Sequence, residues 1–270
     1  MNNFKPTPRV DLNQVLEKIV SRMMDVLQEN LLGVYLGGSF AHGGWDDYSD
    51  VDFDVVIGQD LHPGEIAALK VIHASVYVDE CYYARHLEGA YFPKDVLGDL
   101  ARTDERIWYL DNGSLNFERS IHDNTLVNRW VLRERGITLM GPDPKTWIPH
   151  VPDALLKAEV LRTMLDWGRE ILCGAYIMDN RWAQTFAVLS YCRMLHTLAV
   201  GEVHSKPEGS AWAKKHLDPE WTDLIADALS TRPNQYVKIY QPSDPFKVVR
   251  TRDFICYAIH KEQSDSRGLG

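Results

Sequence analysis

The feature that most constrains the fold is a short apolar run that ends in a glycine turn and is followed by paired aspartates. The run Leu31–Leu36 leads into Gly37-Gly38-Ser39, and ten residues separate Ser39 from Asp50-Val51-Asp52. A short apolar run that stops at glycines is typical of a buried strand that enters a tight turn. Val51–Ile57 combines acidic and apolar residues in alternation and predicts a second strand. These elements predict a mixed α/β domain.

The aspartates of this motif indicate metal chemistry. Side chains at positions i and i+2 of a strand lie on the same face, so Asp50 and Asp52 are expected to lie side by side. Adjacent carboxylates repel each other, and a divalent cation removes the repulsion. In proteins Mg²⁺ takes one or two carboxylates together with phosphate oxygens and water, and a pair of such ions stabilises a phosphoryl displacement. A glycine turn lets the backbone approach a phosphate, and the Ser39 hydroxyl adds a donor.

Apolar periodicity predicts the remaining elements of the chain. In the N-terminal part the predicted elements are helices over Leu12–Leu27, His62–Ser75 and Leu126–Arg135 and a strand over Leu87–Phe92. The polar stretch Gly98–Asn124 is predicted to be irregular. In the C-terminal part every predicted element is a helix: Ala154–Leu172, Trp182–Val200, Ala211–His216, Trp221–Leu229 and Arg252–His260.

A cluster of glycine and proline residues marks the expected domain boundary. Gly141-Pro142-Asp143-Pro144 stops the preceding helical pattern, and Pro149 and Pro152 follow. We therefore expect an α/β (α+β) domain with a short mixed sheet over residues 1–150. An all-α helical bundle is expected over residues 151–270.

Composition and charge exclude several classes of protein. The net charge of −9 and the pI near 5.6 argue against a nucleic-acid-binding protein, and an acidic body attracts cationic small molecules. The cysteines lie far apart and are predicted to be free thiols: Cys81, Cys173, Cys192 and Cys256. No stretch approaches the roughly 18 apolar residues of a membrane span, and the N-terminus lacks the apolar core of a signal peptide. We expect a cytoplasmic protein without a membrane partner.

Several motifs resemble those of known nucleotidyltransferases. Gly37-Gly38-Ser39 with Ser49-Asp50-Val51-Asp52 resembles the signature of the polymerase-β-like nucleotidyltransferase superfamily. The closer resemblance, which covers most of the chain, is to bacterial aminoglycoside adenylyltransferases of the streptomycin/spectinomycin type. Three further stretches carry it: Leu87-Glu88-Gly89-Ala90-Tyr91, the run from Arg133 to Pro142, and Cys192-Arg193 with Ser205-Lys206-Pro207. The resemblance implies a nucleotidyltransferase domain over residues 1–150 and a substrate- and nucleotide-binding helical domain over residues 151–270.

The resemblance also implies roles for single residues. Asp50 and Asp52 are the expected ligands of Mg²⁺, with two ions per site, and ATP is the expected co-substrate. Glu88 fits the third carboxylate that the family places on a neighbouring strand, and its implied role is that of general base. The implied nucleotide-binding positions in this motif are Gly38, Ser39 and Ser49.

Two cations in the C-terminal part add to the expected nucleotide site. Arg193 lies on a helix that is apolar almost all round, and a buried guanidinium needs a carboxylate or phosphate partner. Lys206 precedes Pro207, a residue favoured in the first turn of a helix, where anions bind. In the resembling family an arginine and a lysine at this same separation hold the ATP phosphates.

The acceptor site is the least defined part of the resemblance. The family binds the amino sugar with acids of the helical domain and with a tryptophan. Asp179 matches one such acid, whereas Ala183 stands where a second is expected, which favours an acceptor other than streptomycin. Trp108 lies near the expected position of the tryptophan.

We therefore predict a monomeric adenylyltransferase that moves AMP from Mg·ATP to a hydroxyl of a cationic small molecule and releases pyrophosphate. An aminocyclitol or aminoglycoside antibiotic is the first choice of acceptor. Two alternatives stay open: the same chemistry on a lincosamide or an endogenous metabolite, and a non-catalytic nucleotide sensor or toxin-neutralising module. The presence of Glu88 beside Asp50 and Asp52 argues against the sensor, which needs no base. The acidic charge argues against nucleic-acid polymerisation.

Overall fold

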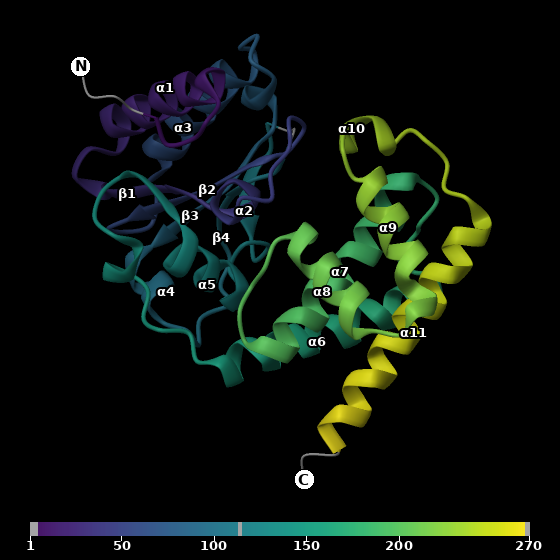
Figure 1. The fold of residues 1–270 in the computed structure, drawn as a ribbon. Coiled ribbons are helices and arrows are strands. Elements are labelled where there is room, and N and C mark those ends of the chain that lie inside the picture. The colour runs from purple at the N-terminus through teal and green to yellow at the C-terminus, as the bar shows by residue number, and fades with distance from the viewer. Residues whose placement is uncertain (1–4, 113–114, 268–270) are drawn as a thin grey trace. The chain divides into compact units, whose positions relative to one another are not determined.

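The structure is a computed structural model that describes residues 5–112 and 115–267. The chain forms two compact units (Figure 1). The first comprises Met1–Gly43 and Asp50–Val151, and the second Gly44–Ser49 and Pro152–Gly270. Residues 44–49, which the sequence placed with the first domain, thus group with the helical unit. Arg232 holds this loop through a 2.7 Å ion pair with Asp46 and a 3.0 Å hydrogen bond to the Gly44 carbonyl.

A six-stranded sheet lies at the centre of the first unit, in the order β5-β4-β3-β2-β1-β6. Strands β2 and β3 are parallel, and every other neighbouring pair is antiparallel. The strands are β1 (Leu31–Leu36), β2 (Val51–Ile57), β3 (Leu87–Pro93), β4 (Ile107–Leu110), β5 (Phe117–Ser120) and β6 (Ile137–Met140). The predicted mixed sheet is therefore confirmed.

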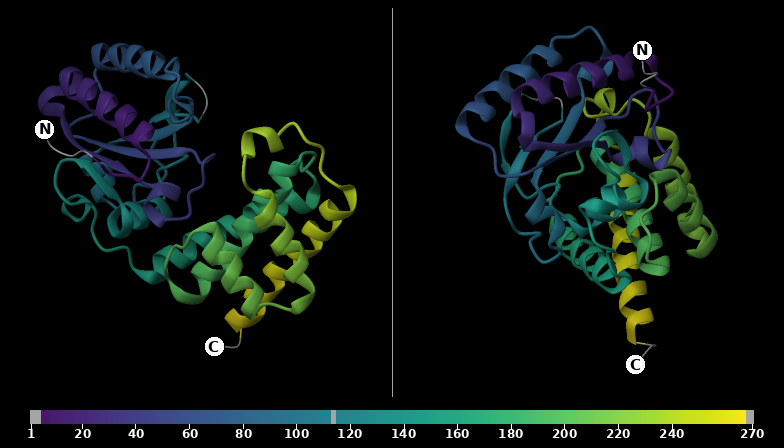
Figure 2. Two further views of the ribbon diagram at one scale, coloured as in Figure 1. Left: turned by 45° about the horizontal axis from the view of Figure 1, so that its top comes forward. Right: turned by 90° about the vertical axis from the view of Figure 1, so that its left-hand side faces the viewer.

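Helices cover both faces of this sheet (Figure 2). The helices of the first unit are α1 (Val10–Leu27), α2 (Gly38–His42), α3 (Pro63–Tyr77), α4 (Lys94–Gly98) and α5 (Leu126–Arg135), with 3-10 turns at Gln28–Asn30, Tyr82–Arg85 and Pro144–Thr146. Helix α3 lies on one face, where its His73 ring stacks on Phe53 of β2. Helices α4 and α5 lie on the other face, where Leu97 and Leu132 share a buried cluster with Ala90. Successive strand residues point to opposite faces, so each strand contributes side chains to the packing on both faces of the sheet.

The expectation of irregular structure over Gly98–Asn124 is wrong, because β4 and β5 lie within it. Each of these strands is only four residues long, which is too short for apolar alternation to stand out. Strand β4 pairs with β3, with Tyr109 opposite Ala90, and β5 extends the sheet beyond β4. The two strands therefore place this part of the chain beside the site-bearing strand β3.

The second unit is all helical, as predicted. Its helices are α6 (Asp153–Cys173), α7 (Arg181–Val200), α8 (Lys206–His216), α9 (Thr222–Thr231), α10 (Gln235–Lys238) and α11 (Pro245–Arg267), with a 3-10 turn at Pro219–Trp221. Helix α7 is central, and its residues Val188, Tyr191 and Leu195 lie fully or almost fully buried in one apolar cluster. Helix α11 extends beyond the predicted Arg252–His260 at both ends, because the polar residues there interrupt the apolar periodicity.

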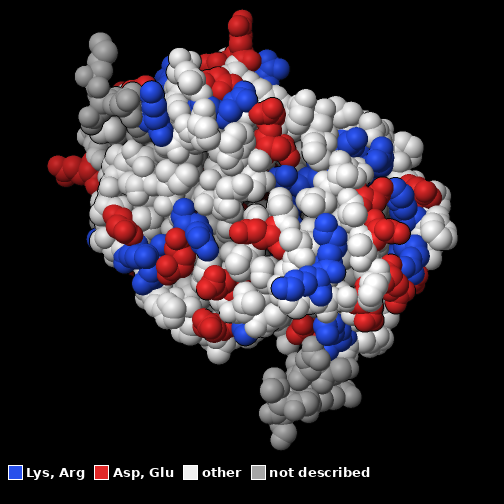
Figure 3. All heavy atoms as spheres, in the orientation of Figure 1, with Lys and Arg blue, Asp and Glu red and all other residues white. Residues whose placement is uncertain are grey.

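The helices, the cysteines and the surface charge can each be compared with the sequence expectations. Over residues 5–112 and 115–267, no helix combines the length and the hydropathy needed to cross a membrane. The four cysteines are free thiols, as predicted. On the face drawn in Figure 3, acidic and basic side chains are intermixed, and the described residues form no basic stripe there.

Candidate active site

Three of the predicted site residues come together on one face of the sheet. In the parallel pair β2–β3, Asp52 lies opposite Glu88. Asp50 comes two residues before Asp52, so its side chain is expected on the same face. Each of these carboxylates offers an oxygen that lies within 4.8 Å of the others. Mg²⁺ takes hard oxygen ligands of this kind. The donor set therefore fits the divalent cation that the sequence implies.

The glycine turn lies directly against this cluster. Gly38 has a φ of +48°, and a Cβ added at this position would overlap the carboxylate of Asp52. The Gly37 amide donates to the Asp52 carbonyl at 3.0 Å. Among the described residues, the buried Ser39 hydroxyl has no hydrogen-bond partner. Buried polar groups are normally satisfied, so this hydroxyl suits a polar ligand such as a phosphate.

Ser49, the third predicted nucleotide-binding residue, shapes the loop before Asp50. Its hydroxyl oxygen is buried and accepts a 2.9 Å hydrogen bond from the Asp46 amide. It also accepts a longer bond, 3.5 Å, from Arg232. The Ser49 hydroxyl oxygen therefore stabilises the loop that precedes Asp50.

The environment of Glu88 suits a general base. Burial raises the pKa of Glu88 to about 8, the hydrogen bond from the Tyr109 hydroxyl lowers it, and the carboxylates of Asp123, Asp50 and Asp111 raise it. A base works best when its pKa lies near the operating pH. The electrostatics are therefore compatible with removing a proton from a hydroxyl near neutral pH.

Two further acids beside the cluster have raised pKa values. Burial raises the pKa of Asp54 to about 7, against a 3.0 Å hydrogen bond from the Asn128 amide. The pKa of Asp123 is raised well above its usual range by burial and by the nearby carboxylates of Asp54 and Asp52. A cation bound at the cluster would lower these pKa values, because a nearby opposite charge favours the ionised carboxylate.

Sequence reasoning missed three residues near Glu88: Tyr109, His122 and Asp123. Glu88, His122 and Asp123 form a second group whose ligand atoms lie within 4.8 Å of one another. All three missed residues lie within the stretch that was predicted to be irregular. The apolar run Ile107–Leu110 was the one signal for a strand, and only its register against β3 identifies Tyr109.

Trp108 is not brought together with Glu88. Tyr109 reaches Glu88, and its neighbour Trp108 therefore projects from the opposite face of β4. There its ring stacks on Phe117 at 5.2 Å, with the Arg119 guanidinium 4.9 Å from the ring centre. Trp108 therefore packs against other side chains on the face of the sheet that α3 covers.

Arg193 and Lys206 are both connected to the segment between α7 and α8. Arg193 donates from Nε to the His204 carbonyl at 2.9 Å, two residues before Lys206. Ser205 caps α8, Pro207 lies in its first turn as predicted, and the Lys206 ammonium lies 5.0 Å from the ring centre of Phe186. The Arg193 side chain therefore reaches from α7 to the segment that leads into α8, and Lys206 begins α8.

Asp179 lies at the other end of α7. It is exposed, and Asn180, the next residue, caps the helix. From Arg181 to Arg193 the helix rises by roughly 18 Å. The helical unit therefore presents its acid and its two cations at separate places.

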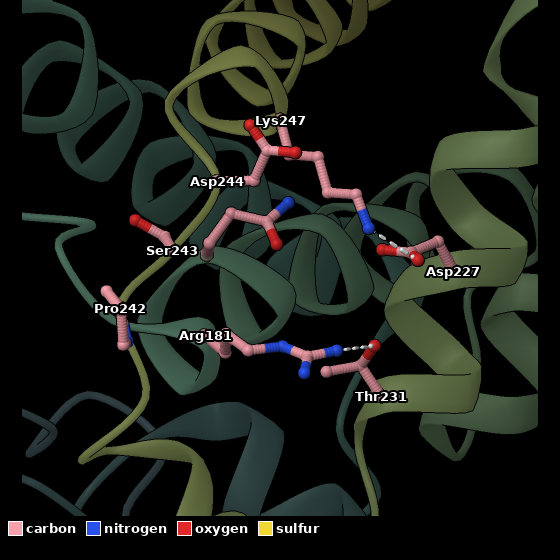
Figure 4. Close-up of a pocket in the computed structure, with 8 residues that line it drawn as sticks. Arg181, Asp227, Thr231, Pro242, Ser243, Asp244 and Lys247 are labelled. Atoms are coloured by element: carbon pink, nitrogen blue, oxygen red, sulfur yellow. Dashed lines mark hydrogen bonds and ion pairs between the residues drawn. The ribbon is translucent and has the colours of Figure 1, made fainter.

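A hollow of about 350 Å³ lies in the helical unit between α7, α9 and α11 (Figure 4). Three of its charged groups are partnered within it: Lys247 pairs with Asp227 at 2.6 Å, and Arg181 donates to the Thr231 hydroxyl at 3.2 Å. These contacts join α11 to α9 and α7 to α9. We interpret the hollow as a structural joint.

Comparisons with known proteins agree with these features. Residues 150–255 match the family described as "Aminoglycoside adenylyltransferase, C-terminal domain". A spectinomycin 9-adenylyltransferase of Staphylococcus aureus is 26% identical over 230 residues, covering 79% of this chain and 82% of the relative. One from Campylobacter jejuni is 24% identical over 225 residues, covering 80% and 83%.

A solved structure shares the fold. The crystal structure of a spectinomycin adenyltransferase from Enterococcus faecialis, with ATP and spectinomycin, superposes with a TM-score of 0.66 at 16% identity. The match covers 90% of this chain and 98% of that one. This match shows the fold, while the family match over residues 150–255 and the sequence relatives support an aminoglycoside adenylyltransferase-like nucleotidyltransferase.

Proposed function

We propose that this nucleotidyltransferase moves the adenylyl group of Mg·ATP to a hydroxyl of an aminocyclitol antibiotic and releases pyrophosphate. The observation that carries the proposal is the cluster of Asp50, Asp52 and Glu88, with oxygens within 4.8 Å of one another beside the Gly38-Ser39 turn. The names of the sequence relatives, which are spectinomycin 9-adenylyltransferases, support an aminocyclitol as the acceptor.

In the proposed mechanism the residues of the first unit prepare the reacting atoms. Asp50 and Asp52 would hold Mg²⁺, two ions in all, and the bound metal would supply positive charge that neutralises the phosphates. Ser39 donates its unsatisfied hydroxyl to a phosphate oxygen, and Gly38 leaves room for the Asp52 carboxylate. Glu88 accepts the proton of the attacking hydroxyl. The acceptor oxygen then bonds to the α-phosphorus as pyrophosphate leaves.

We propose that residues 1–150 bind the metal and accept the proton. Residues 151–270 provide further contacts to ATP and to the acceptor. Arg193 and Lys206 hold phosphates of ATP, which suits two cations that are both connected to the segment between α7 and α8. The exposed Asp179 binds an ammonium group of the acceptor. Trp108, the other residue predicted to bind the acceptor, stays a prediction, and it projects from the face opposite to Glu88.

The apolar side chain at position 183 limits the choice of acceptor. Ala183 is buried, with 3% of its surface exposed, and offers no charge where the family has a second acid. We therefore propose an acceptor with fewer cationic contacts than streptomycin makes, such as spectinomycin. The enzyme is proposed to act as a monomer in the cytoplasm, on a small molecule and not on nucleic acid.

The test is a panel of acceptors incubated with the purified protein and Mg·ATP. Mass spectrometry should find one added adenylyl group on spectinomycin and none on streptomycin. The Glu88→Gln variant serves as a control: it should bind ATP normally and turn over roughly 10²–10⁴-fold more slowly, the usual size of a general-base contribution. Modification of a lincosamide alone would replace the acceptor. ATP binding without any modified product would favour the sensor and contradict the proposal.

A further inference from the structure

The base Glu88 is held by one of its two carboxylate oxygens. The Tyr109 hydroxyl donates to Glu88 Oε1. The sheet makes this contact possible, since Tyr109 pairs with Ala90 and so projects on the same face as Glu88, two residues earlier in β3. The contact therefore links two neighbouring strands, whose backbones are fixed by their own hydrogen bonds.

A second group approaches the same oxygen from a loop. His122 Nε2 lies 3.5 Å from Glu88 Oε1, and the His122 ring lies 5.2 Å from the ring of Tyr109, centre to centre. The loop is held in place by the buried Asn124, whose amide donates to the carbonyls of Arg102 and Glu105, both at 2.8 Å. His122 therefore lies in a segment that hydrogen bonds hold against the rest of the first unit.

These contacts distinguish the two oxygens of the base. Both neighbours engage Oε1, and within residues 5–112 and 115–267 no side chain donates a hydrogen bond to Oε2. A carboxylate held by one oxygen keeps the other in a defined direction. Defined direction matters because proton transfer and attack depend on placement to within about 1 Å.

We propose that Tyr109 and His122 are positioning residues that hold Oε1 of Glu88, so that Oε2 receives the proton of the acceptor hydroxyl. This rests on the proposed function, in which Glu88 is the base. The O–H bond of the acceptor breaks, its proton goes to Oε2, and its oxygen bonds to the α-phosphorus of ATP. The bond from that phosphorus to the bridging oxygen breaks, and pyrophosphate leaves with the electron pair.

The first test is Tyr109→Phe, which removes the hydroxyl and keeps the ring. We expect kcat to fall by about 10- to 100-fold, the cost of a base displaced by up to about 1 Å. The KM for acceptor and the Kd for ATP should stay within about twofold of the parent values, because Tyr109 touches neither substrate in this account. A general loss of structure would change all three constants.

Tyr91→Phe is the matched control. Tyr91 lies on β3, is fully buried, and its hydroxyl contacts His73 Nε2 at 2.8 Å on the opposite face of the sheet. This variant also loses one hydroxyl contact in the same sheet, yet it should keep the kcat of the parent. An equal fall in kcat for both variants would mean that the sheet as a whole had been disturbed, and would overturn the proposal.

His122 provides a second test that does not depend on the core, since its side chain is 63% exposed. His122→Ala should lower kcat by about 2- to 5-fold, the size of one exposed polar contact. His122→Gln, whose amide can still donate, should recover most of that loss. A kcat within twofold of the parent for Tyr109→Phe, or equal rates for both His122 variants and the parent, would overturn the positioning role. A parent protein that modifies no acceptor would instead overturn the proposed function, and this inference with it.

Discussion

Gly38→Ala adds a methyl group where the glycine turn meets the metal-binding aspartate. Gly38 has a φ of +48°, and an L-residue in this backbone region costs roughly 1–2 kcal/mol. The new Cβ would also overlap the Asp52 carboxylate, which must rotate or move to make room. We therefore expect two separate effects, a loss of stability and the displacement of a metal ligand.

Gly43→Ala separates the two effects. Gly43 ends the same helix α2 with a φ of +72°, and a Cβ added there would meet no atom within 4 Å. Both variants should lose roughly 1–2 kcal/mol of unfolding free energy, which lowers Tm by roughly 2–8 °C for a chain of this size. Only Gly38→Ala should also lose about 100-fold or more in transfer rate, because misplacing a catalytic group by about 1 Å costs that much.

The assay is the rate of AMP transfer at saturating substrates, with thermal unfolding followed by circular dichroism. Working below both Tm values ensures that the variants are folded when the rates are measured. Equal kcat values for Gly38→Ala and Gly43→Ala would refute the reasoning, since the contact with Asp52 would then have no part in catalysis.

Three further predictions concern the metal site, the nucleotide and the core. Asp52→Asn should leave the fold intact and abolish transfer, and activity within a few-fold of the parent would remove Asp52 from the metal ligands. Arg193→Ala should weaken ATP binding by ~1.5–3 kcal/mol in calorimetry, the value of a charge-assisted contact, while Mg²⁺ binding to the first unit stays unchanged. Burial lowers the pKa of His73 from 6.5 to about 4, so the unfolded chain binds the proton more tightly between these values and stability falls as the pH drops through that window. Urea unfolding should show a loss of roughly 3 kcal/mol between pH 7 and pH 4 that is absent in His73→Gln, and equal losses in both proteins would contradict the assignment.

The sequence was sufficient to predict the strands that carry the acidic cluster. Strands β1, β2 and β3 are apolar enough to be recognised, and the i, i+2 spacing of Asp50 and Asp52 sets their shared face. Glu88 was found only through a family resemblance. Its place opposite Asp52 depends on how β3 pairs with β2, which local periodicity does not determine.

The surroundings of the base could not be predicted for the same reason. Tyr109 and Trp108 are adjacent in the chain, and only the register of β4 on β3 decides which of them faces Glu88. The sequence offered no sign that Tyr109 contacts Glu88, and Trp108 was predicted only as a contact of the acceptor. Register depends on tertiary pairing, and a shift of one residue exchanges the two faces of a strand.

The fate of the phosphates of ATP tests the central claim most directly. In the proposed reaction the adenylyl group moves to the acceptor, and the β- and γ-phosphates leave together as pyrophosphate. With ATP labelled at the α-phosphorus, the label should appear in the modified aminocyclitol, in equal amount to the pyrophosphate released. With ATP labelled at the γ-phosphorus, the label should be found only in pyrophosphate, and its appearance in the acceptor would contradict adenylyl transfer.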